Sequence, residues 1–196
     1  MNRIIPYQNG LCRPLDPYTP HDVVHTRLFP QQGFSISLRP LCLESDGALL
    51  RSWVRQECMS LLGRQKIPYT EILQTLIHTS HSDFAQLFTC IDDTGQLLCE
   101  MQVFRASQDD ELGINGVARA GDYVLHPMPG RIMQDRYRAC ILTCAEYCLM
   151  HTEVKRILVL ADEENSRDNM AFNKAGFSLL TRISTPYKVC NLYKYP

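Results

Sequence analysis

The sequence predicts a single α/β (α+β) domain, built from a mixed central sheet with helices on both of its faces. Its 196 residues suffice for one sizeable hydrophobic core. Segments with the two-residue alternation of strands are interspersed with segments of helical spacing, in the order β-α-α-β-β-β-α-β-α-β-β. The apolar run at 157–160 is typical of a strand buried on both faces, as in layered sheets that helices cover on either side.

The N-terminal segment, residues 1–33, is expected to be an extended arm that packs on the domain formed by residues 34–196. Proline fixes φ and lacks a backbone N–H, so it disfavours long helices and central strands. Five of the eleven prolines fall in this arm: Pro6, Pro14, Pro17, Pro20 and Pro30.

Within the domain, each element is predicted from its periodicity. Phe34, Ile36 and Leu38 alternate with polar residues, which indicates a half-buried strand at 34–39. The same reasoning gives, in chain order, a helix capped at Ser45 or Asp46, a second helix after Pro68, strands at 84–91 and 96–105 around a turn at 92–95, a loop at 107–116, a strand at 119–125, a helix at 136–150, a strand at 156–161, a helix at 162–175 and a terminal hairpin of 177–184 and 188–195.

Composition and charge exclude several classes of function. The formal net charge of −1 gives no general attraction to nucleic acid or to an anionic membrane, so we expect neither partner. No apolar run approaches the ~20 residues that span a bilayer, and the N-terminus lacks the apolar region of a signal peptide, so we expect a cytoplasmic protein. The nine cysteines are expected to be reduced core thiols. No metal site is expected, because His21 and His25 have no evident third ligand.

The most specific pattern lies in the C-terminal third. Asn165 follows the apolar strand, Phe172 comes seven residues later, and Gly176-Phe177 end the helix. This segment closely resembles the GNAT acetyltransferase superfamily, and a weaker likeness covers about residues 34–196. The resemblance implies that the strand splays from its neighbour to admit an acyl-CoA, that Asn165 bonds the pantetheine amide, and that Phe172 packs on the CoA chain. From the residues alone, Asn165 could instead cap a helix in a plain strand–helix–strand unit.

The resemblance also implies a site for the CoA phosphates at the start of the helix near 136. Members of the superfamily have an Arg or Gln and two glycines there, whose backbone N–H groups hold the pyrophosphate. In this sequence Arg131, Gln134 and Arg136 keep the register, but the glycines are absent. Backbone N–H groups from Leu125 to Pro127 are expected to polarise the thioester carbonyl.

Within the superfamily, the closest resemblance is to siderophore-biosynthesis acyltransferases, which acylate lysine or hydroxylysine, and to the ribosomal-protein N-acetyltransferase group. The segments that carry it include Cys99-Glu100 and Asp122 to His126. It implies that Glu100 and Asp122 contact the acceptor and that His126 takes the acceptor's proton. From the residues alone, His126 could instead end the strand by bonding a carbonyl.

The sequence therefore predicts an N-acyltransferase that moves an acyl group from acyl-CoA, with acetyl-CoA the expected donor. The acceptor is a primary amine or hydroxylamine, with a lysine-derived siderophore precursor as one candidate. A non-catalytic binding or sensor module of the same fold is the alternative, because the phosphate loop lacks its glycines. Two departures from the family favour that alternative: Leu160 replaces a carboxylate of the siderophore relatives, and Phe172 replaces a tyrosine common in GNAT enzymes.

Overall fold

The computed structural model describes residues 11, 22–61, 69–109, 112–113, 115–130, 132–185 and 188–195. Within these ranges, eight strands form one sheet in the order β1-β2-β3-β4-β5-β6-β8-β7, and every neighbouring pair is antiparallel except β5 and β6. The strands are β1 His25–Phe29, β2 Phe34–Pro40, β3 Ala85–Asp92, β4 Leu97–Arg105, β5 Asp122–Pro129, β6 Arg156–Asp162, β7 Ser178–Ser184 and β8 Val189–Tyr195. The helices are α1 Leu43–Leu61, α2 Tyr69–Ser80, α4 Gln134–Leu149 and α5 Ser166–Lys174, with a 3₁₀ turn η1 at Ala106–Gln108.

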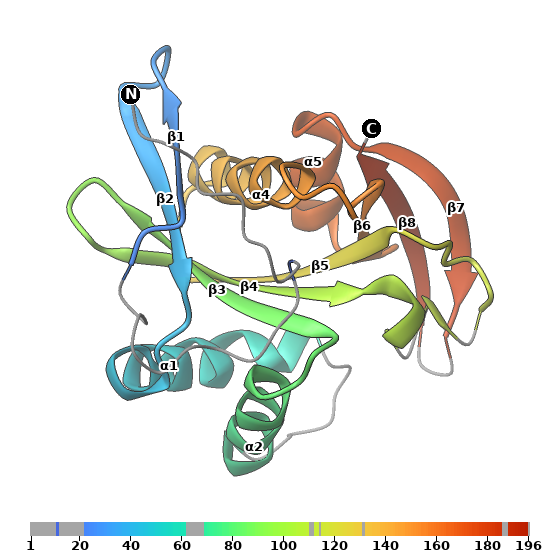
Figure 1. Ribbon diagram of the computed structural model, residues 1–196, viewed down its shortest axis with the longest axis horizontal. Helices are drawn as coiled ribbons and strands as arrows, with labels where there is room; N and C mark the ends of the chain where they lie inside the picture. The colour runs from blue at the N-terminus through green and yellow to red at the C-terminus, as the bar shows by residue number, and fades with distance from the viewer. Residues whose placement is uncertain are drawn as a thin grey trace.

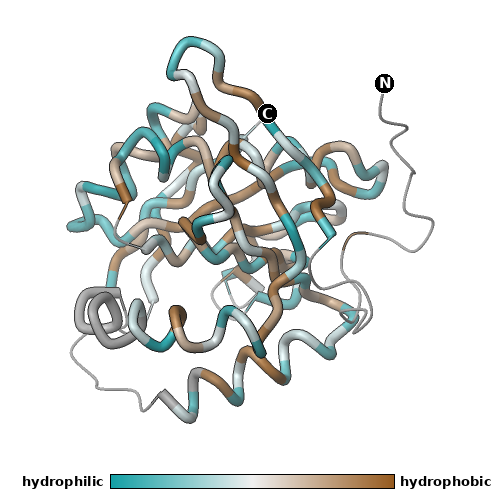
Figure 2. Tube along the Cα trace, turned by 90° about the vertical axis from the view of Figure 1, so that its left-hand side faces the viewer, coloured by the Kyte–Doolittle hydropathy of each residue, from teal (hydrophilic) through white to brown (hydrophobic). Residues whose placement is uncertain are grey.

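The helices form two layers, one on each side of the sheet (Figure 1). Helices α4 and α5 cover one face, and α1 and α2 cover the other. The largest hydrophobic cluster lies beneath α4 and α5, and a smaller one joins α1 and α2 to β3 through Leu50, Trp53, Leu76 and Leu87. Figure 2 shows hydrophobic stretches in the central strands and hydrophilic stretches in the surrounding turns. The predicted fold class is therefore confirmed.

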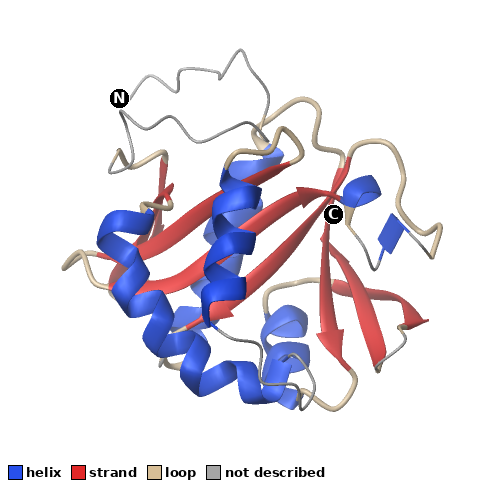
Figure 3. Ribbon diagram, turned by 90° about the horizontal axis from the view of Figure 1, so that it is seen from below, coloured by secondary structure: helices blue, strands red, loops and turns tan. Residues whose placement is uncertain are grey.

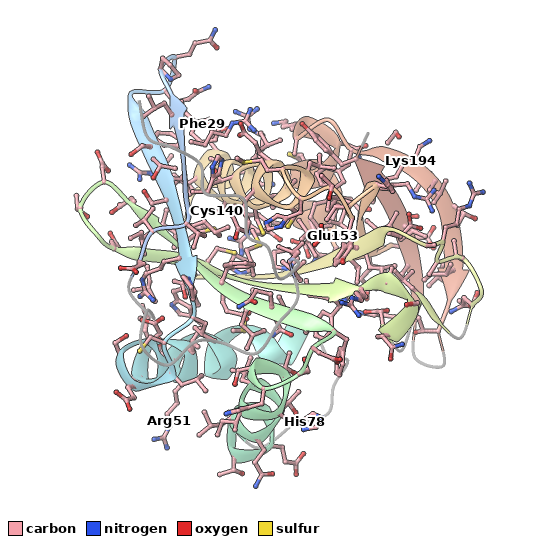
Figure 4. The ribbon with its side chains drawn as sticks, in the orientation of Figure 1. Phe29, Arg51, His78, Cys140, Glu153 and Lys194 are labelled. Carbon is pink, nitrogen blue, oxygen red and sulfur yellow. The ribbon has the colours of Figure 1, made fainter. Side chains whose placement is uncertain are left out.

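The cysteines behave as small core residues. Among the described residues, seven free cysteines are all buried, and Cys140 lies in α4 over the sheet (Figure 4). Burial raises the pKa of the Cys90 and Cys99 thiols well above the ordinary value. Buried thiols of this kind stay protonated and unreactive, as the sequence predicted.

The sheet begins earlier in the chain than predicted. Strand β1 pairs with β2 through a turn in which Gly33 has φ 71°, a left-handed conformation that suits glycine. The predicted boundary at residue 34 therefore falls inside a hairpin, and His25–Phe29 of the expected arm belong to the sheet. Pro30 follows β1 directly, and no proline interrupts the strand, which lies at the edge of the sheet. Most of the remaining arm lies outside the described residues, but Leu11 is buried and its N–H donates to Glu153 Oε1 at 2.7 Å.

The two parallel strands separate partway along their length. Strands β5 and β6 pair from Asp122↔Arg156 to Leu125↔Val159 and no further. Beyond that point β5 continues beside β4 alone, and β6 continues beside β8 alone. In Figure 3 the strands accordingly form two groups that meet near the C-terminus and separate towards the lower edge of the picture. The predicted divergence of these strands is confirmed.

No helix in the described ranges is both long and apolar enough to cross a membrane.

Candidate functional site

Beyond Leu125, the backbone groups of β5 that face β6 form no strand pairing with it. Backbone groups alternate in direction along a strand, and Gly130 N–H donates to the Leu98 carbonyl of β4 at 2.9 Å. Odd-numbered residues of β5 therefore direct their backbone groups towards β6. Beyond Leu125 these residues are Pro127 and Pro129, which have no N–H.

The β5 edge of the gap consequently offers carbonyl oxygens and no backbone donor beyond Leu125. A ligand chain threaded along this edge needs N–H donors of its own, as the amides of a pantetheine arm provide. The expectation of polarising N–H groups up to Pro127 is corrected, because Pro127 cannot donate. Leu125 has an N–H, but this residue forms the last pair with β6, so its backbone groups take part in the sheet.

His126 lies at the point where the strands diverge. It is the first residue of β5 beyond the pairing with β6, and its side chain is on the face that α1 and α2 cover, the same face as Val124 and Met128. The ring is 35% exposed and meets Phe104 edge-on at 5.5 Å between centroids. An imidazole with this exposure can reach a ligand in the gap.

A carboxylate that the sequence did not identify holds the His126 ring. Asp109 Oδ2 lies 2.7 Å from His126 Nε2, and Asp109 Oδ1 accepts the Leu112 N–H at 2.9 Å. Asp109 follows η1 and its side chain is 7% exposed. No sequence pattern identifies this pair, because Asp109 belongs to an acidic run in a polar loop and only the fold brings it to β5.

Glu100 is buried on the same face as His126. It lies opposite Met128 in the pairing of β4 with β5, and Gln102 of the same strand lies opposite His126. Its carboxyl has no exposed surface, so it contacts no surface ligand in this conformation. Burial raises the pKa of Glu100 to about 8, although a hydrogen bond from Gln102 to Oε2 at 3.4 Å opposes the rise. Oε1 has no hydrogen-bond partner within the described ranges, which is costly for a buried polar atom.

Asp122 lies at the other end of β5, away from the point of divergence. It is buried, forms a bidentate ion pair with Arg156, and accepts a hydrogen bond from the Arg119 N–H at 2.9 Å. These bonds join the start of β5 to the start of β6. These bonds give Asp122 a structural role, and its expected contact with the acceptor stays a prediction.

The phosphate-binding residues expected from the sequence have other partners. Gln134 Nε2 donates to the Arg167 carbonyl at 2.8 Å. Arg136 pairs with Asp92 at 3.3 Å and stacks over the Phe34 ring at 4.6 Å, which directs its charge to the β3–β4 turn. Arg131 lies outside the described residues. The expectation that Arg136 contacts CoA phosphates is therefore not supported by its position.

A different arginine lies beside the start of α4. Arg167 in the first turn of α5 donates to the Ile132 carbonyl at 3.4 Å and stacks over the Tyr137 ring at 5.2 Å. The N-cap residue Met133 supplies no side-chain hydrogen bond to the first turn of α4. Uncapped N–H groups at a helix start favour an anion, although Asp135 adds a negative charge there.

The Asn165–Phe177 segment is chiefly structural. Asn165 caps α5: its Oδ1 accepts the Asp168 N–H and its Nδ2 donates to Asp168 Oδ2 at 2.8 Å. Tyr137 OH donates to Asp168 at 3.0 Å, which ties α5 to α4. Phe172 is fully buried against Phe177 and Tyr193, so it has no surface to pack on a CoA chain. In this conformation Asn165 is a helix cap and Phe172 a core residue, and their expected contacts with CoA stay predictions.

Asn169, which the sequence analysis did not select, is the hydrogen-bonding centre of this region. Its Nδ2 donates to the Asp162 carbonyl at 2.8 Å, and its Oδ1 accepts from Tyr193 OH and Asn191 Nδ2 of β8. These bonds fix the end of β6 on its own side of the gap. Within the described part of the chain, no group of three His, Cys, Asp or Glu side chains is placed to hold a metal ion.

Comparisons with solved structures identify proteins with a similar fold. No family model and no curated protein matches the sequence. The structure is similar to that of an uncharacterized protein from Bacillus halodurans, with a TM-score of 0.74 and 18% identity over 86% of this chain and 88% of that one. It is also similar to the aminoglycoside acetyltransferase AAC(6')-Ib in complex with coenzyme A and kanamycin, with a TM-score of 0.67 and 16% identity over 82% of this chain and 94% of that one.

A third similar structure is the spermidine N-acetyltransferase from Vibrio cholerae in complex with CoA and spermine, with a TM-score of 0.62 and 12% identity over 82% of this chain and 94% of that one. The chain therefore has the fold of the GNAT acetyltransferases. At these identities the likeness defines the fold and leaves the reaction to be argued from the site.

Proposed function

We propose that this protein is an N-acyltransferase that carries an acyl group, normally acetyl, from acyl-CoA to a primary amine or hydroxylamine. The observation that carries the proposal is the position of His126, which stands at the mouth of the β5–β6 gap with its Nε2 held by Asp109. A thioester in the gap and an amine on the α1/α2 face would meet beside this imidazole.

The gap suits the pantetheine arm of an acyl-CoA. The carbonyl groups of Pro127 and Pro129, beyond the last pair with β6, would accept hydrogen bonds from its amide N–H groups. The two prolines also lack the N–H groups through which β5 could pair further with β6. At the far end, the start of α4 has no side-chain cap and Arg167 places a positive charge beside it, which would favour the phosphates. These residues would bind the cosubstrate, and no metal takes part in the proposal.

The reaction needs a free amine, because an ammonium has no lone pair with which to attack. A lysine-type ammonium has a pKa of about 10.4 and arrives protonated at neutral pH. In the proposed reaction His126 takes that proton, the amine nitrogen bonds to the thioester carbon, and the C–S bond breaks. The second amine proton leaves as the tetrahedral adduct collapses, and the CoA thiolate is protonated on release.

Glu100 and Gln102 provide the polar lining next to His126. With a pKa of about 8, Glu100 is mostly protonated at neutral pH, so it is a hydrogen-bond donor rather than a fixed anion. Glu100 is fully buried and does not contact the acceptor in this conformation, but its neutral form places no fixed anion beside His126. The proposed acceptor is one that reacts in its neutral form, such as a free amine or an N-hydroxy group. Lysine-derived hydroxylamines belong to this class, and the similar acetyltransferase structures contain kanamycin and spermine, respectively.

The alternative is a non-catalytic module that binds an acyl-CoA or another ligand. It is favoured by one specific observation: Gln134 and Arg136 are bonded to the protein itself, and Asp135 stands in the first turn of α4. Weak phosphate binding would be compatible with a sensor or with a slow enzyme.

Two measurements separate these functions. Acetyl-CoA that binds the folded protein raises its unfolding temperature, by an amount equivalent to about 2.7 kcal/mol at 100 times the Kd. Release of free CoA thiol in the presence of a panel of primary amines and hydroxylamines then reports transfer. Thiol release that depends on the acceptor supports the enzyme. Stabilisation by acetyl-CoA without acceptor-dependent thiol release supports the binding module. The absence of both stabilisation and thiol release would contradict the proposal.

A further inference from the structure

The Asp109–His126 pair has more supporting contacts than a surface ion pair. Both carboxylate oxygens are occupied, one by His126 Nε2 at 2.7 Å and the other by the Leu112 N–H at 2.9 Å. The backbone around Asp109 is also fixed, because its carbonyl accepts the Gly113 N–H at 2.8 Å. The carboxylate is therefore held in place before any ligand arrives.

This arrangement determines where the His126 ring carries its proton. A carboxylate only accepts hydrogen bonds, so Nε2 must donate to Asp109. In the neutral ring, the other nitrogen, Nδ1, then has the free lone pair. The edge of Phe104 lies against the ring and restricts its rotation. The ring is thus presented with Nδ1 as the atom that can accept a proton.

We propose that Asp109 is the positioning residue for His126: it fixes the Nε2–H tautomer, directs Nδ1 towards the acceptor amine, and stabilises the imidazolium that forms when the proton is taken. This inference rests on the proposed acyl transfer. Asp109 itself touches neither the thioester nor the amine. The proton moves from the acceptor nitrogen to Nδ1, while the Nε2 proton stays in the bond to Asp109.

Few other charged side chains near His126 could hold its ring in one tautomer. The titratable groups on this face of β4 and of the following loop, within the described ranges, are Glu100 and Asp109, and Gln102 and Phe104 complete the lining of the ring from β4. Glu100 lies one position further along the face, opposite Met128, and hydrogen-bonds to Gln102 rather than to His126. Asp109 is the carboxylate in contact with the imidazole.

The test is Asp109→Asn, a substitution that keeps the shape and reverses the hydrogen bond. The Leu112 N–H requires an oxygen, so the amide nitrogen must face His126 and donate to Nε2. The ring is then forced into the Nδ1–H tautomer and loses its free lone pair on the acceptor side. We expect kcat to fall about 10²–10⁴-fold, the range of a lost general base. Asp93→Asn, at an exposed aspartate of the β3–β4 turn, is the matched control.

A readout without substrate separates this inference from the proposed function. Nitrogen-15 NMR of the wild-type ring, assigned by its loss in His126→Gln, should show the Nε2–H tautomer, and Asp109→Asn should convert it to Nδ1–H. The Asp109 substitution should also have no further effect on kcat in the His126→Gln background. A wild-type Nδ1–H tautomer, or equal effects of Asp109→Asn in both backgrounds, would overturn the proposal. The NMR spectrum reports the tautomer of the His126 ring without any substrate. It therefore tests the role of Asp109 even if the protein shows no acyl transfer.

Discussion

The two ends of the β5–β6 gap use their polar side chains in opposite ways. At the His126 end, Asp109 holds the ring and one imidazole nitrogen remains for a ligand. At the α4 end, Gln134 donates to the Arg167 carbonyl and Arg136 pairs with Asp92, so both side chains are bonded to the protein itself. In the proposed acyl transfer, the difference would place preorganised groups at the thioester and acceptor, and fewer groups at the phosphates.

A charge-assisted hydrogen bond contributes about 1.5–3 kcal/mol, so each absent phosphate contact weakens cosubstrate binding about tenfold or more. Preorganised groups at the reacting atoms raise kcat instead. We therefore expect substitutions at the His126 end to lower kcat strongly, and substitutions at the α4 end to change KM for acyl-CoA modestly.

The largest effect is expected for His126→Ala. Removal of the proton acceptor should lower kcat about 10²–10⁴-fold while CoA affinity and stability change little. The acid limb of the pH profile of kcat/KM should disappear as well. His78→Ala is the matched control, because His78 lies in α2 and is exposed (Figure 4). Full activity of His126→Ala would show that the proton leaves by another route.

The next largest effect is a gain of stability in Glu100→Gln. The folded pKa of about 8 exceeds the ordinary 4.5, so the folded state binds the extra proton and its stability falls as pH rises from 4.5 to 8. Glutamine removes this penalty, which amounts to about 3 kcal/mol at pH 7. Urea denaturation should show the variant to be more stable than wild type at pH 7 to 8 and equal to it at pH 4. An equal difference at both values would contradict the assigned protonation state.

Gly130 lies between β5 and α4 and packs against Trp53 of α1. Its substitution should lower the stability of the folded protein by disturbing this contact. A Cβ at this position would lie 2.7 Å from two ring carbons of Trp53. Overpacking of this kind costs about 1–3 kcal/mol. Chemical denaturation should detect the loss in Gly130→Ala, and Trp53→Leu in the same chain should recover part of it relative to Trp53→Leu alone. Additive losses would mean that the two residues do not compete for space.

The smallest effect distinguishes the two arginines near α4. Arg167→Ala should weaken CoA binding by about 1 kcal/mol, and more at low ionic strength, because it removes a cation beside the helix start. Arg136→Ala should leave CoA affinity unchanged within error, because its charge faces Asp92. Isothermal titration at two salt concentrations measures both. A larger loss for Arg136→Ala would restore the phosphate role expected from the sequence.

Periodicity predicted most of the fold, because alternating and helical patterns depend on local burial. The hairpin strand β1 was missed because the prolines around it suggested an extended arm, and only pairing with β2 makes residues 25–29 a strand. The divergence of β5 and β6 was predicted through the family resemblance to the Asn165–Phe177 segment, although the residues in that segment proved to be a cap and a core side chain.

The site was predictable only in part. His126 was selected through the resemblance of the segment from Asp122 to His126, and its role stays a prediction. Its partner Asp109 is separated from it in the sequence by a polar loop with other acidic residues. The burial of Glu100 and the ion pair of Asp122 with Arg156 depend on packing that periodicity does not describe. A sequence gives the type of a polar residue, and the fold decides whether it faces a ligand or another side chain.

The most direct test of this contrast compares two acyl donors, acetyl-CoA and S-acetylpantetheine, which shares the thioester arm and lacks the nucleotide and its phosphates. With a reactive amine acceptor, we predict that kcat is similar for both donors and that kcat/KM differs by less than about 100-fold, equivalent to about 2.7 kcal/mol of phosphate contacts. His126→Ala should lower kcat with either donor. A collapse of kcat with S-acetylpantetheine, or a difference in kcat/KM above about 10⁴-fold, would contradict the claim that the thioester end carries the function.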